Sequence, residues 1–518
     1  MISKYAVERY LTATRNNSEL AKKLDNEQLT RALARWAPGA TFVTEPRRHQ
    51  LISFLLAMKY PSYAIFLDMG LGKTKVTLDV FANRRRSGQV QRLLVVVPNA
   101  ANVQGWIDQV AVHRPSLTTF GVGVTPGSRE DGVLGDRDIV VLTYASFYRE
   151  CCNTSVPSSN DDPRSGRYVP DPQKMMALAN RFQMLVLDES QNIKNHQSLQ
   201  FGCARYLSHL IPYRYALTGT PMGRDPEDLW SQMFYVDHGD TLGSTLALFR
   251  QAFCSKSNDP YTGFPVWTFR DTMRDDFNRI LCSRSVRFTK EECLDLPEIT
   301  YTKLTVTLPK STWSYYSKAL EQAQNARDGD HKLLASVFLN MRQIASGYLV
   351  LRSDDGGDAH VVFKNNPKLE ALVEKLKELP SQEKAVVFFE YRYTGKLIRE
   401  ALQKAGWQTA TIEGGSSGKS KILKRFDTDK KLRVLLVNTA AGGTGLNLQV
   451  ANNAFFFETP VSPINRQQAV ARIHRMGQDK PAFVYDLVAK ATVDERVLRY
   501  LAEGLDLSQA LIDHRVLT

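Results

Sequence analysis

The stretch from Ala64 to Thr74 reads AIFLDMGLGKT and decides the fold class of the chain. Its first four residues are apolar, as in a buried strand, and they lead directly into a glycine-rich turn. The two glycines let the backbone turn tightly, so that amide groups can point at phosphate oxygens. Lys73 can then reach the β- and γ-phosphates of ATP, Thr74 can offer a hydroxyl to Mg²⁺, and the following helix directs its positive end at the anion. The residues assigned to the phosphates are therefore Met69, Gly70, Leu71, Gly72, Lys73 and Thr74.

Adjacent carboxylates end a second apolar run, Met184–Gln191, which reads MLVLDESQ. Asp188 is placed to hold Mg²⁺, and Glu189 is placed to orient or deprotonate an attacking water. The alternative is that these two carboxylates only face solvent at the end of a strand. Such a strand end seldom follows a GKT turn in the same series of alternating strands and helices. The segment LTGTP after the next run carries Thr218 and Thr220, whose hydroxyls suit a relay between the carboxylates and a second lobe.

Short apolar runs recur along the chain, and each is followed by a helical pattern. The first series is Ala64–Leu67, Leu93–Pro98, Asp138–Tyr144, Met184–Glu189 and Tyr213–Thr220, and the second is Ala385–Glu390, Gln408–Gly414, Arg433–Thr439, Ala454–Thr459 and Phe483–Ala489. Runs such as LLVVVP and VLLVNT are continuous rather than alternating, which is typical of strands in parallel sheets covered by helices. The two series predict an α/β protein with two lobes.

The expected organisation is a helical extension at 1–45, a first lobe at 46–236, helical insertions at 237–362, a second lobe at 363–500 and a tail at 501–518. One strand-like piece, Tyr301–Leu308, interrupts the insertions. The stretch Cys151–Pro172 is rich in proline and small polar residues, which predicts a mobile surface loop.

Composition and charge narrow the class of partner. The 518 residues include 67 Lys and Arg against 54 Asp and Glu, a net charge of +13 that favours a polyanion partner, although many basic proteins only gain solubility this way. The six cysteines form no CxxC pair, which argues against a zinc ribbon or a disulfide framework, and Cys151 and Cys152 are expected to be reduced thiols in a loop. Without a membrane-spanning stretch or a secretory signal, the protein is expected in the cytosol, either of a bacterium or of a phage-infected host.

Two arginines in the second lobe are candidates for the γ-phosphate. Gln467–Gln478 reads QQAVARIHRMGQ, and Arg472 and Arg475 stand three residues apart, so on a helix they would share a face. An arginine supplied from across a cleft stabilises the charge that builds up during phosphoryl transfer. A solvated basic helix is the competing interpretation, and His474 between the two arginines is expected to be structural.

Two further segments suit contact with nucleic-acid phosphates. Asn438–Leu448 reads NTAAGGTGLNL, and its glycines, Gly443 and Gly445 among them, allow close approach of the backbone to a ligand. Ser416–Arg433 carries seven basic residues, beginning with Lys419, against two aspartates. This forms a plausible edge for tracking phosphates, but a solvated helix face explains most of these side chains nearly as well.

Taken together, DMGLGKT, DESQ, LTGTP, GGTGLNL and QAVARIHRMGQ resemble, in order, the motifs of the Swi/Snf ATPases of helicase superfamily two. The resemblance covers about residues 45–501. It implies two RecA-like lobes with Mg·ATP in the cleft, a DNA-stimulated ATPase, and stepping along double-stranded DNA. By this resemblance Gln50 reads adenine and Gln468, Arg472 and Arg475 contact the nucleotide, whereas Gly443 and Gly445 couple the lobes. Contacts to nucleic acid are then expected from Trp106, Thr143, Lys419 and Asn447.

The motifs also depart from the family pattern. The strict GxxxxGK spacing fails, Ser190 and Gln191 replace the commoner Ala or Gly and His, and ETPVSP at 458–463 lacks the usual tryptophan. YDLVAKATVDERVL, from Tyr485, resembles the annealing helicases of the HepA-related type, and a compact prokaryotic or phage-like member is expected. Two rivals remain: an enzyme that separates, anneals or branch-migrates strands at forked or branched DNA, and a DNA- or polymerase-binding module without ATPase activity. A monomer is expected, and no protein partner is indicated.

Overall fold

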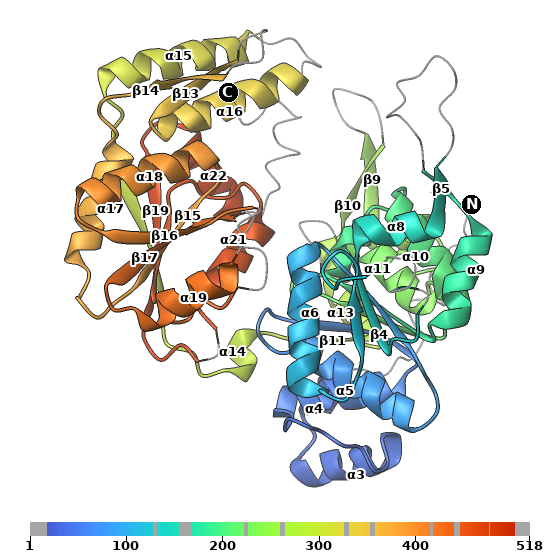
Figure 1. Cartoon of the computed structure of the whole chain (residues 1–518). Coiled ribbons are helices and arrows are strands. Elements are labelled where there is room, and N and C mark those ends of the chain that lie inside the picture. The colour runs from blue at the N-terminus through green and yellow to red at the C-terminus, as the bar shows by residue number, and fades with distance from the viewer. Residues whose placement is uncertain are drawn as a thin grey trace. The chain divides into compact units, whose positions relative to one another are not determined.

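The computed structural model describes residues 18–502 except 128–132, 134, 155–167, 222–225, 259–264, 326–330, 353–357, 415–417, 440–445 and 476. The chain divides into two units, Met1–Cys293 and Leu294–Thr518. Each unit is built on its own parallel sheet and is described by itself (Figure 1). Within the described residues, no helix combines the length and the apolar character that a membrane crossing requires.

The first unit contains a seven-stranded sheet of order β11-β1-β8-β7-β2-β4-β3, and every pairing in it is parallel. Its strands are β1 (Ser62–Leu67), β2 (Leu93–Val97), β3 (Thr119–Gly121), β4 (Ile139–Thr143), β7 (Met184–Asp188), β8 (Tyr213–Leu217) and β11 (Ser285–Phe288). The five strands predicted for this lobe are thus confirmed, and β3 and β11 are added at its edges.

The continuous apolar runs form central strands because helices cover both faces of the sheet. One face packs on α8 (Tyr144–Cys151), α9 (Pro172–Arg181), α10 (Leu199–Leu210) and α11 (Asp228–Asp237). The other packs on α4 (Arg48–Lys59), α5 (Lys73–Arg86) and α6 (Ala100–His113). Because all strands run the same way, the segments that follow β1, β8 and β7 leave neighbouring positions on one edge of the sheet.

The second unit contains a six-stranded parallel sheet of order β12-β19-β18-β15-β17-β16. Its strands are β12 (Ile299–Val306), β15 (Ala385–Phe389), β16 (Gln408–Ile412), β17 (Leu432–Asn438), β18 (Asn453–Phe456) and β19 (Ala482–Ala489). The five predicted strands are confirmed. One face packs on α17 (Pro367–Glu378) and α18 (Arg392–Lys404), and the opposite face packs on α19 (Lys419–Thr428) and α21 (Pro463–Val470).

Residues 237–362 differ from the expected helical insertion. They supply an edge strand to each sheet, because β11 pairs with β1 and β12 pairs with β19. They also form two antiparallel hairpins, β9 (Cys254–Asn258) with β10 (Pro265–Phe269) and β13 (Tyr348–Arg352) with β14 (Asp358–Val362). Their helices are α12 (Leu246–Phe253), α13 (Arg274–Leu281), α14 (Lys290–Cys293), α15 (Lys310–Gln324) and α16 (His331–Ala345). In the second unit, α15 and α16 share an apolar core with α22 (Val493–Ala502).

The adjacent cysteines do not lie in an exposed loop as expected. Cys151 ends α8, Cys152 begins β5 (Cys152–Thr154), and both side chains are buried in the first core. β5 pairs with β6 (Tyr168–Pro170), so the described ends of the proline-rich stretch form a hairpin, and its centre lies outside the described residues. Sγ of Cys152 lies 3.8 Å from Sγ of Cys203, and all six cysteines are free thiols. The N-terminal segment forms α2 (Ser18–Lys22) and α3 (Asn26–Trp36).

Candidate functional site

The glycine-rich turn joins β1 to α5, as predicted. Gly70 and Gly72 have φ angles of 89° and 88°, a left-handed conformation that favours glycine over any residue with a Cβ. Gly72 is also the N-cap of α5. A Cβ at Gly72 would lie 2.4 Å from Nε2 of Gln50, so both the backbone angle and the space require glycine here.

Two side chains from the first turn of α4 hold this turn in place. Nε2 of Gln50 donates to the Leu71 carbonyl at 3.0 Å, and the His49 ring donates to the same oxygen at 3.0 Å. Oε1 of Gln50 accepts from the Arg47 amide at 3.0 Å. Burial lowers the pKa of His49 below its ordinary value, which favours the neutral ring. The predicted adenine-reading residue thus lies directly against the phosphate loop.

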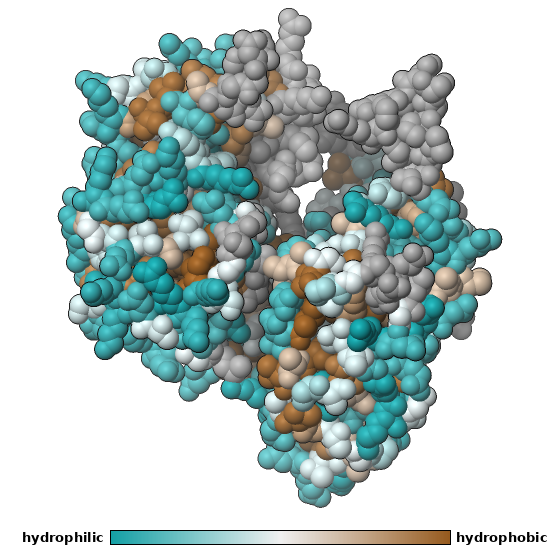
Figure 2. Space-filling view, in the orientation of Figure 1, coloured by the Kyte–Doolittle hydropathy of each residue, from teal (hydrophilic) through white to brown (hydrophobic). Residues whose placement is uncertain are grey.

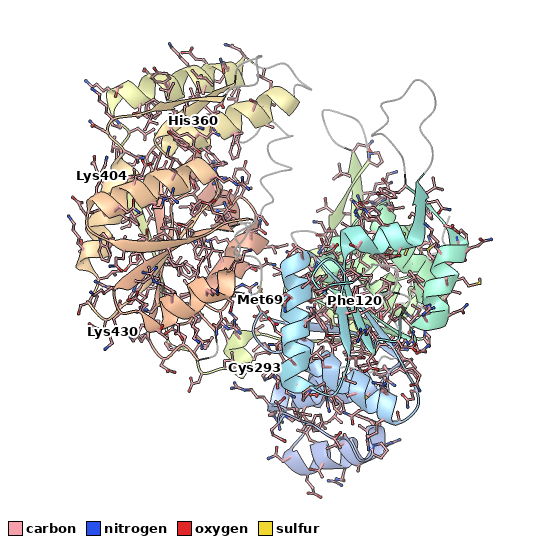
Figure 3. The ribbon with its side chains drawn as sticks, viewed as in Figure 1. Met69, Phe120, Cys293, His360, Lys404 and Lys430 are labelled. Atoms are coloured by element: carbon pink, nitrogen blue, oxygen red, sulfur yellow. The ribbon has the colours of Figure 1, made fainter. Side chains whose placement is uncertain are left out.

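Lys73 lies at the base of the turn. Its Nζ donates to the Leu67 carbonyl at 2.9 Å, and a Cβ on Gly219 would lie 3.4 Å from the same nitrogen. Gly219 follows β8, so the ammonium group lies at the carboxyl ends of two neighbouring strands. Thr74 is partly exposed in the first turn of α5. Met69, which is labelled in Figure 3, precedes α5 and is also partly exposed.

Asp188 ends β7 with both carboxylate oxygens engaged. Oδ2 accepts from the indole Nε1 of Trp106 at 2.8 Å, and Oδ1 accepts from the Glu189 amide at 3.1 Å. The side chains of Asp188 and Glu189 are both buried. Burial, followed by repulsion from Glu189, raises the pKa of Asp188 above its ordinary value, whereas the Trp106 hydrogen bond and the Lys73 charge oppose this rise.

Glu189 has a left-handed backbone, with a φ of 50°. Among the described residues predicted to be catalytic, no other has this conformation. Such a conformation costs energy and is concentrated at functional sites. Its Oε2 accepts from Nε2 of Gln191 at 3.1 Å and from Oγ1 of Thr218 at 3.3 Å. Thr218 in turn accepts from the Thr220 amide at 3.0 Å. The predicted relay residues therefore contact the predicted catalytic carboxylate.

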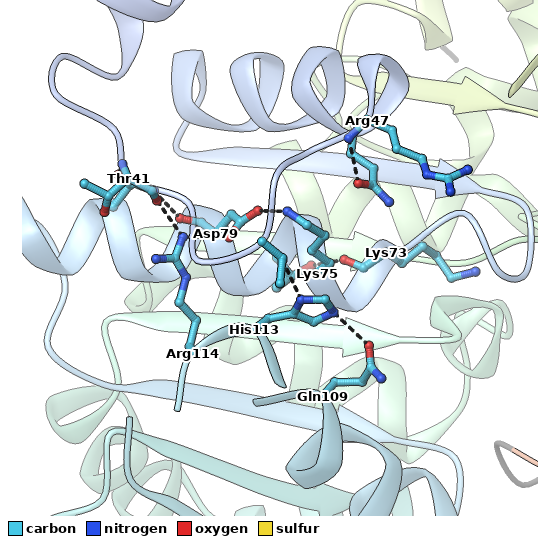
Figure 4. Close-up of polar contacts among 12 residues, drawn as sticks. Thr41, Arg47, Lys73, Lys75, Asp79, Gln109, His113 and Arg114 are labelled. Carbon is cyan, nitrogen blue, oxygen red and sulfur yellow. Dashed lines mark hydrogen bonds and ion pairs between the residues drawn. The ribbon is translucent and has the colours of Figure 1, made fainter. Parts of the chain in front are cut away.

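A buried polar network supports α5, the helix that follows the phosphate loop (Figure 4). Asp79 on α5 is ion-paired with Lys75 and with Arg114, each at 2.6 Å, and its side chain is almost fully buried. Arg114 also donates to the Thr41 carbonyl at 2.8 Å. Asn83 both accepts from the Thr41 amide and donates to its carbonyl, which ties the segment before α4 to α5. Sequence reasoning gave no role to these residues.

The residues present fit a magnesium ion delivered with a nucleotide. Among the described residues, no group of three or more His, Cys, Asp or Glu side chains could enclose a metal ion. Mg²⁺ is usually bound by one or two carboxylates together with waters and substrate phosphates. Asp188 and Thr74 supply the hard oxygen ligands that such an ion prefers, beside a loop whose shape suits phosphates.

The residues predicted to contact nucleic acid fall into different environments. Trp106 is only 2% exposed and its indole N–H is bound to Asp188, which speaks against a direct contact. Thr143 caps α8 by accepting from the Ser146 amide at 3.1 Å. Lys419 begins α19, Asn447 is exposed, and Gly443 and Gly445 lie outside the described residues. Hydrophilic side chains gather over α19 (Figure 2), and Lys430 extends just beyond its end (Figure 3).

The arginine pair of the second unit does not lie on a helix, contrary to the prediction. Helix α21 ends at Val470, and Arg472 and Arg475 follow in successive turns. The Arg472 carbonyl accepts from the Leu448 amide at 3.1 Å. Burial lowers the pKa of Arg475 below its ordinary value. Gln468 is partly exposed on α21, and the His474 ring donates to the Pro297 carbonyl at 2.8 Å, which fits the expected structural role.

The altered ETPVSP segment is held by a buried network. Glu458 is fully buried, where Oε1 accepts from Thr394 at 2.6 Å and Oε2 accepts from the Glu390 amide at 3.0 Å. Arg342 of α16 donates to the Thr459 carbonyl at 2.7 Å and is ion-paired with Glu390 at 2.9 Å. Sequence reasoning missed these links, because nothing local indicates which helix packs on this strand end.

Comparison with known proteins shows which family these motifs represent. The model for the SNF2-related domain matches residues 49–352, and that for the helicase conserved C-terminal domain matches residues 367–477. An uncharacterized ATP-dependent helicase of Mycoplasma pneumoniae is 28% identical over 86% of this chain and 40% of its own length. The chromodomain-helicase-DNA-binding protein 1-like of Danio rerio is 24% identical over 97% of this chain and 47% of its own length.

The chain spans about half the length of the curated relatives that it matches first. Among solved structures, the SWI2/SNF2 ATPase core of Sulfolobus solfataricus in complex with double-stranded DNA is 23% identical, with a TM-score of 0.40 over 92% of this chain and 94% of the other.

Proposed function

From the premise that the chain belongs to the SNF2-related domain family, we propose that it is a DNA-dependent ATPase that moves along double-stranded DNA. One observation carries this proposal. The carboxyl ends of β1, β8 and β7 are neighbours, and they present Lys73 with Thr74, Thr218, and Asp188 with Glu189. An ammonium group, a hydroxyl and two carboxylates beside a glycine turn are the groups that phosphoryl transfer to water requires.

Each of these groups has a defined task in the proposed reaction. The glycine turn and Lys73 bind the phosphates, and Thr74 and Asp188 hold the Mg²⁺ that neutralises charge on them. Glu189 orients the attacking water and accepts its proton, while Gln191 and Thr218 fix the direction of its carboxylate. We further propose that Arg472, Arg475 and Gln468 contact the nucleotide, as the resemblance of their segment to the family motif implies.

The proposed partner is DNA. The net charge of +13 suits a polyanion, and a relative that aligns with nearly the whole chain is named as DNA-binding. Exposed basic side chains on and just after α19 can follow a phosphate backbone. They are Lys421, Lys424, Arg425, Lys430 and Lys431.

The test is ATP turnover by the full chain with duplex, single-stranded and forked DNA and with RNA. We expect duplex DNA to stimulate turnover at least tenfold, and Lys73→Ala and Glu189→Gln to abolish the stimulated rate. Retained stimulation in either variant would contradict the assigned site. Absence of turnover with every nucleic acid would favour a binding module without ATPase activity.

Movement is tested separately from hydrolysis. ATP-dependent displacement of a third strand from a duplex, without unwinding of a tailed duplex, is the expected result for plain translocation. Unwinding, annealing or branch migration of forked substrates without triplex displacement would instead support the strand-remodelling alternative.

A further inference from the structure

Two aromatic side chains from different helices donate hydrogen bonds to the same aspartate. Nε1 of Trp106 on α6 donates to Oδ2 of Asp188 at 2.8 Å. The hydroxyl of Tyr144, the first residue of α8, donates to the main-chain carbonyl of Asp188 at 3.1 Å. One bond therefore fixes the carboxylate and the other fixes the backbone that carries it.

All three residues are buried, with exposures of 2% for Trp106, 5% for Tyr144 and 8% for Asp188. A hydrogen bond to an ionised group in such surroundings is stronger than a neutral one. With Trp106 on Oδ2 and the Glu189 amide on Oδ1, the carboxylate cannot rotate without breaking a bond. Each oxygen keeps further accepting capacity, which is available to a metal ion or its waters.

We propose that Trp106 is a positioning residue for Mg²⁺, which holds the Asp188 carboxylate in the orientation that the metal–nucleotide complex requires. Tyr144 supports it by fixing the Asp188 main chain. This inference rests on the proposed function in one respect, namely that Mg·ATP is the ligand. Outer-shell partners of this kind commonly change metal affinity by ten- to a hundredfold when they are lost.

The chain offers a matched control. Trp230 is also a buried tryptophan of the first unit, at 6% exposure, and its Nε1 donates to the Gly243 carbonyl at 3.0 Å. Trp106→Phe and Trp230→Phe therefore remove the same group from similarly buried positions, but only Trp106 contacts the carboxylate. A general packing effect would appear in both variants.

The experiment measures equilibrium binding of a fluorescent N-methylanthraniloyl ATP to the full chain, first in EDTA and then across a MgCl₂ titration. For Trp106→Phe we expect metal-free affinity within twofold of the unaltered protein and a Mg²⁺ midpoint raised about fivefold or more. For Trp230→Phe both values should be unchanged. An unshifted Mg²⁺ midpoint in Trp106→Phe, or an equal loss of binding with and without metal, would overturn the proposal.

A second substitution covers the case in which Trp106→Phe does not fold. Incorporating 3-benzothienylalanine at position 106 replaces the indole N–H by sulfur and keeps the ring shape, and it should raise the Mg²⁺ midpoint in the same way. Turnover is not measured here, so the result stands apart from the proposed function. If the unaltered protein failed to bind the nucleotide with Mg²⁺, the proposed function would be wrong. If it bound and the variant at position 106 had the same Mg²⁺ midpoint, only the role of Trp106 would be wrong.

Discussion

Gln191 donates a hydrogen bond from Nε2 to Oε2 of Glu189 across 3.1 Å. The residue that departs from the commoner histidine of the family therefore contacts the proposed catalytic carboxylate directly. Gln191→Glu replaces this donor with a second carboxylate, so Glu189 loses the hydrogen bond that orients it and faces a like charge instead. We expect kcat to fall about 10- to 100-fold, while the KM for ATP stays within threefold.

Gln104→Glu is the control for this substitution. Gln104 lies exposed on α6 and donates from Nε2 to the Asp108 carboxylate at 2.7 Å, so the same change of group is made at the surface. Its kcat should match the unaltered protein across the pH range. A Gln191→Glu enzyme with full activity at neutral pH would remove Gln191 from the site.

Asp188 is expected to destabilise the first unit when no metal is bound. Its folded pKa lies above the unfolded value near 4, so its contribution to stability is present below that value and is lost as the pH rises through the folded pKa. Asp188→Asn removes this pH-dependent loss, at the cost of one hydrogen bond, because an amide oxygen can accept from only one of the Trp106 and Glu189 N–H groups. In EDTA, the stability of the variant relative to the unaltered protein should therefore be greater at pH 8 than at pH 4.5, by about 1 kcal/mol or ~2–4 °C in the melting temperature. This pH-dependent difference is the gain that ionisation predicts.

The gain in Asp188→Asn should shrink toward pH 4.5, where the native carboxyl is largely protonated because burial raises its pKa to about 6. Mg·ATP should raise the melting temperature of the unaltered protein and not that of the variant. An equal difference between the two proteins at both pH values would show that the effect comes from packing rather than ionisation. Thermal melts at the two pH values, with and without Mg·ATP, provide the measurement.

The strands and the phosphate loop were predictable because their signals are local. Continuous apolar runs identify strands covered on both faces, and the GKT turn follows its strand without interruption. The partner of Trp106 was not predictable, because burial depends on how α6 packs beside β7. Edge strand β11 was not predictable, because it has only four residues and one of them, Arg287, is charged and exposed.

The end of helix α21 shows a tertiary effect overriding a local pattern. No glycine or proline follows Val470 until Gly477, so no residue type marks the end of the helix before Arg472. In the structure Ile473 is buried in the core of the second unit, and the Leu448 amide donates a hydrogen bond to the Arg472 carbonyl. Those two contacts hold the chain in turns where the residue pattern alone allowed a helix.

Asp79 is expected to be a major determinant of stability. It is almost fully buried with two cations, and removing one partner from such a cluster leaves uncompensated buried charge. Asp79→Ala should lower the free energy of unfolding of the first unit by about 3–5 kcal/mol. Glu27→Ala removes an exposed partner of Arg31 and should cost less than about 1 kcal/mol. Denaturant titration of both variants decides the matter, and a loss in Asp79→Ala no larger than in Glu27→Ala would contradict the expected role.

Helices on the two faces of the second sheet carry separate sets of basic residues, so the salt dependence of DNA binding can show which set contacts the phosphates. Helix α19 carries exposed Lys421, Lys424 and Arg425, and α18 on the opposite face carries exposed Lys396, Arg399 and Lys404. Replacing either set by alanine changes the net charge by the same three units, so a general electrostatic effect is equal in both triple variants. Only loss of phosphate contacts changes the slope of log Kd against log[salt], by roughly 0.7–0.9 for each contact.

We therefore expect the α19 triple variant to bind duplex DNA more weakly and with a slope shallower by about 2.7, or about 0.9 for each of three lost phosphate contacts. The α18 triple variant should keep the slope of the unaltered protein. Fluorescence anisotropy with a labelled duplex between about 50 and 200 mM salt measures both quantities. Equal slopes in the two triple variants would contradict a DNA contact at α19. Any change in affinity would then come from the altered net charge, which is the same in both variants.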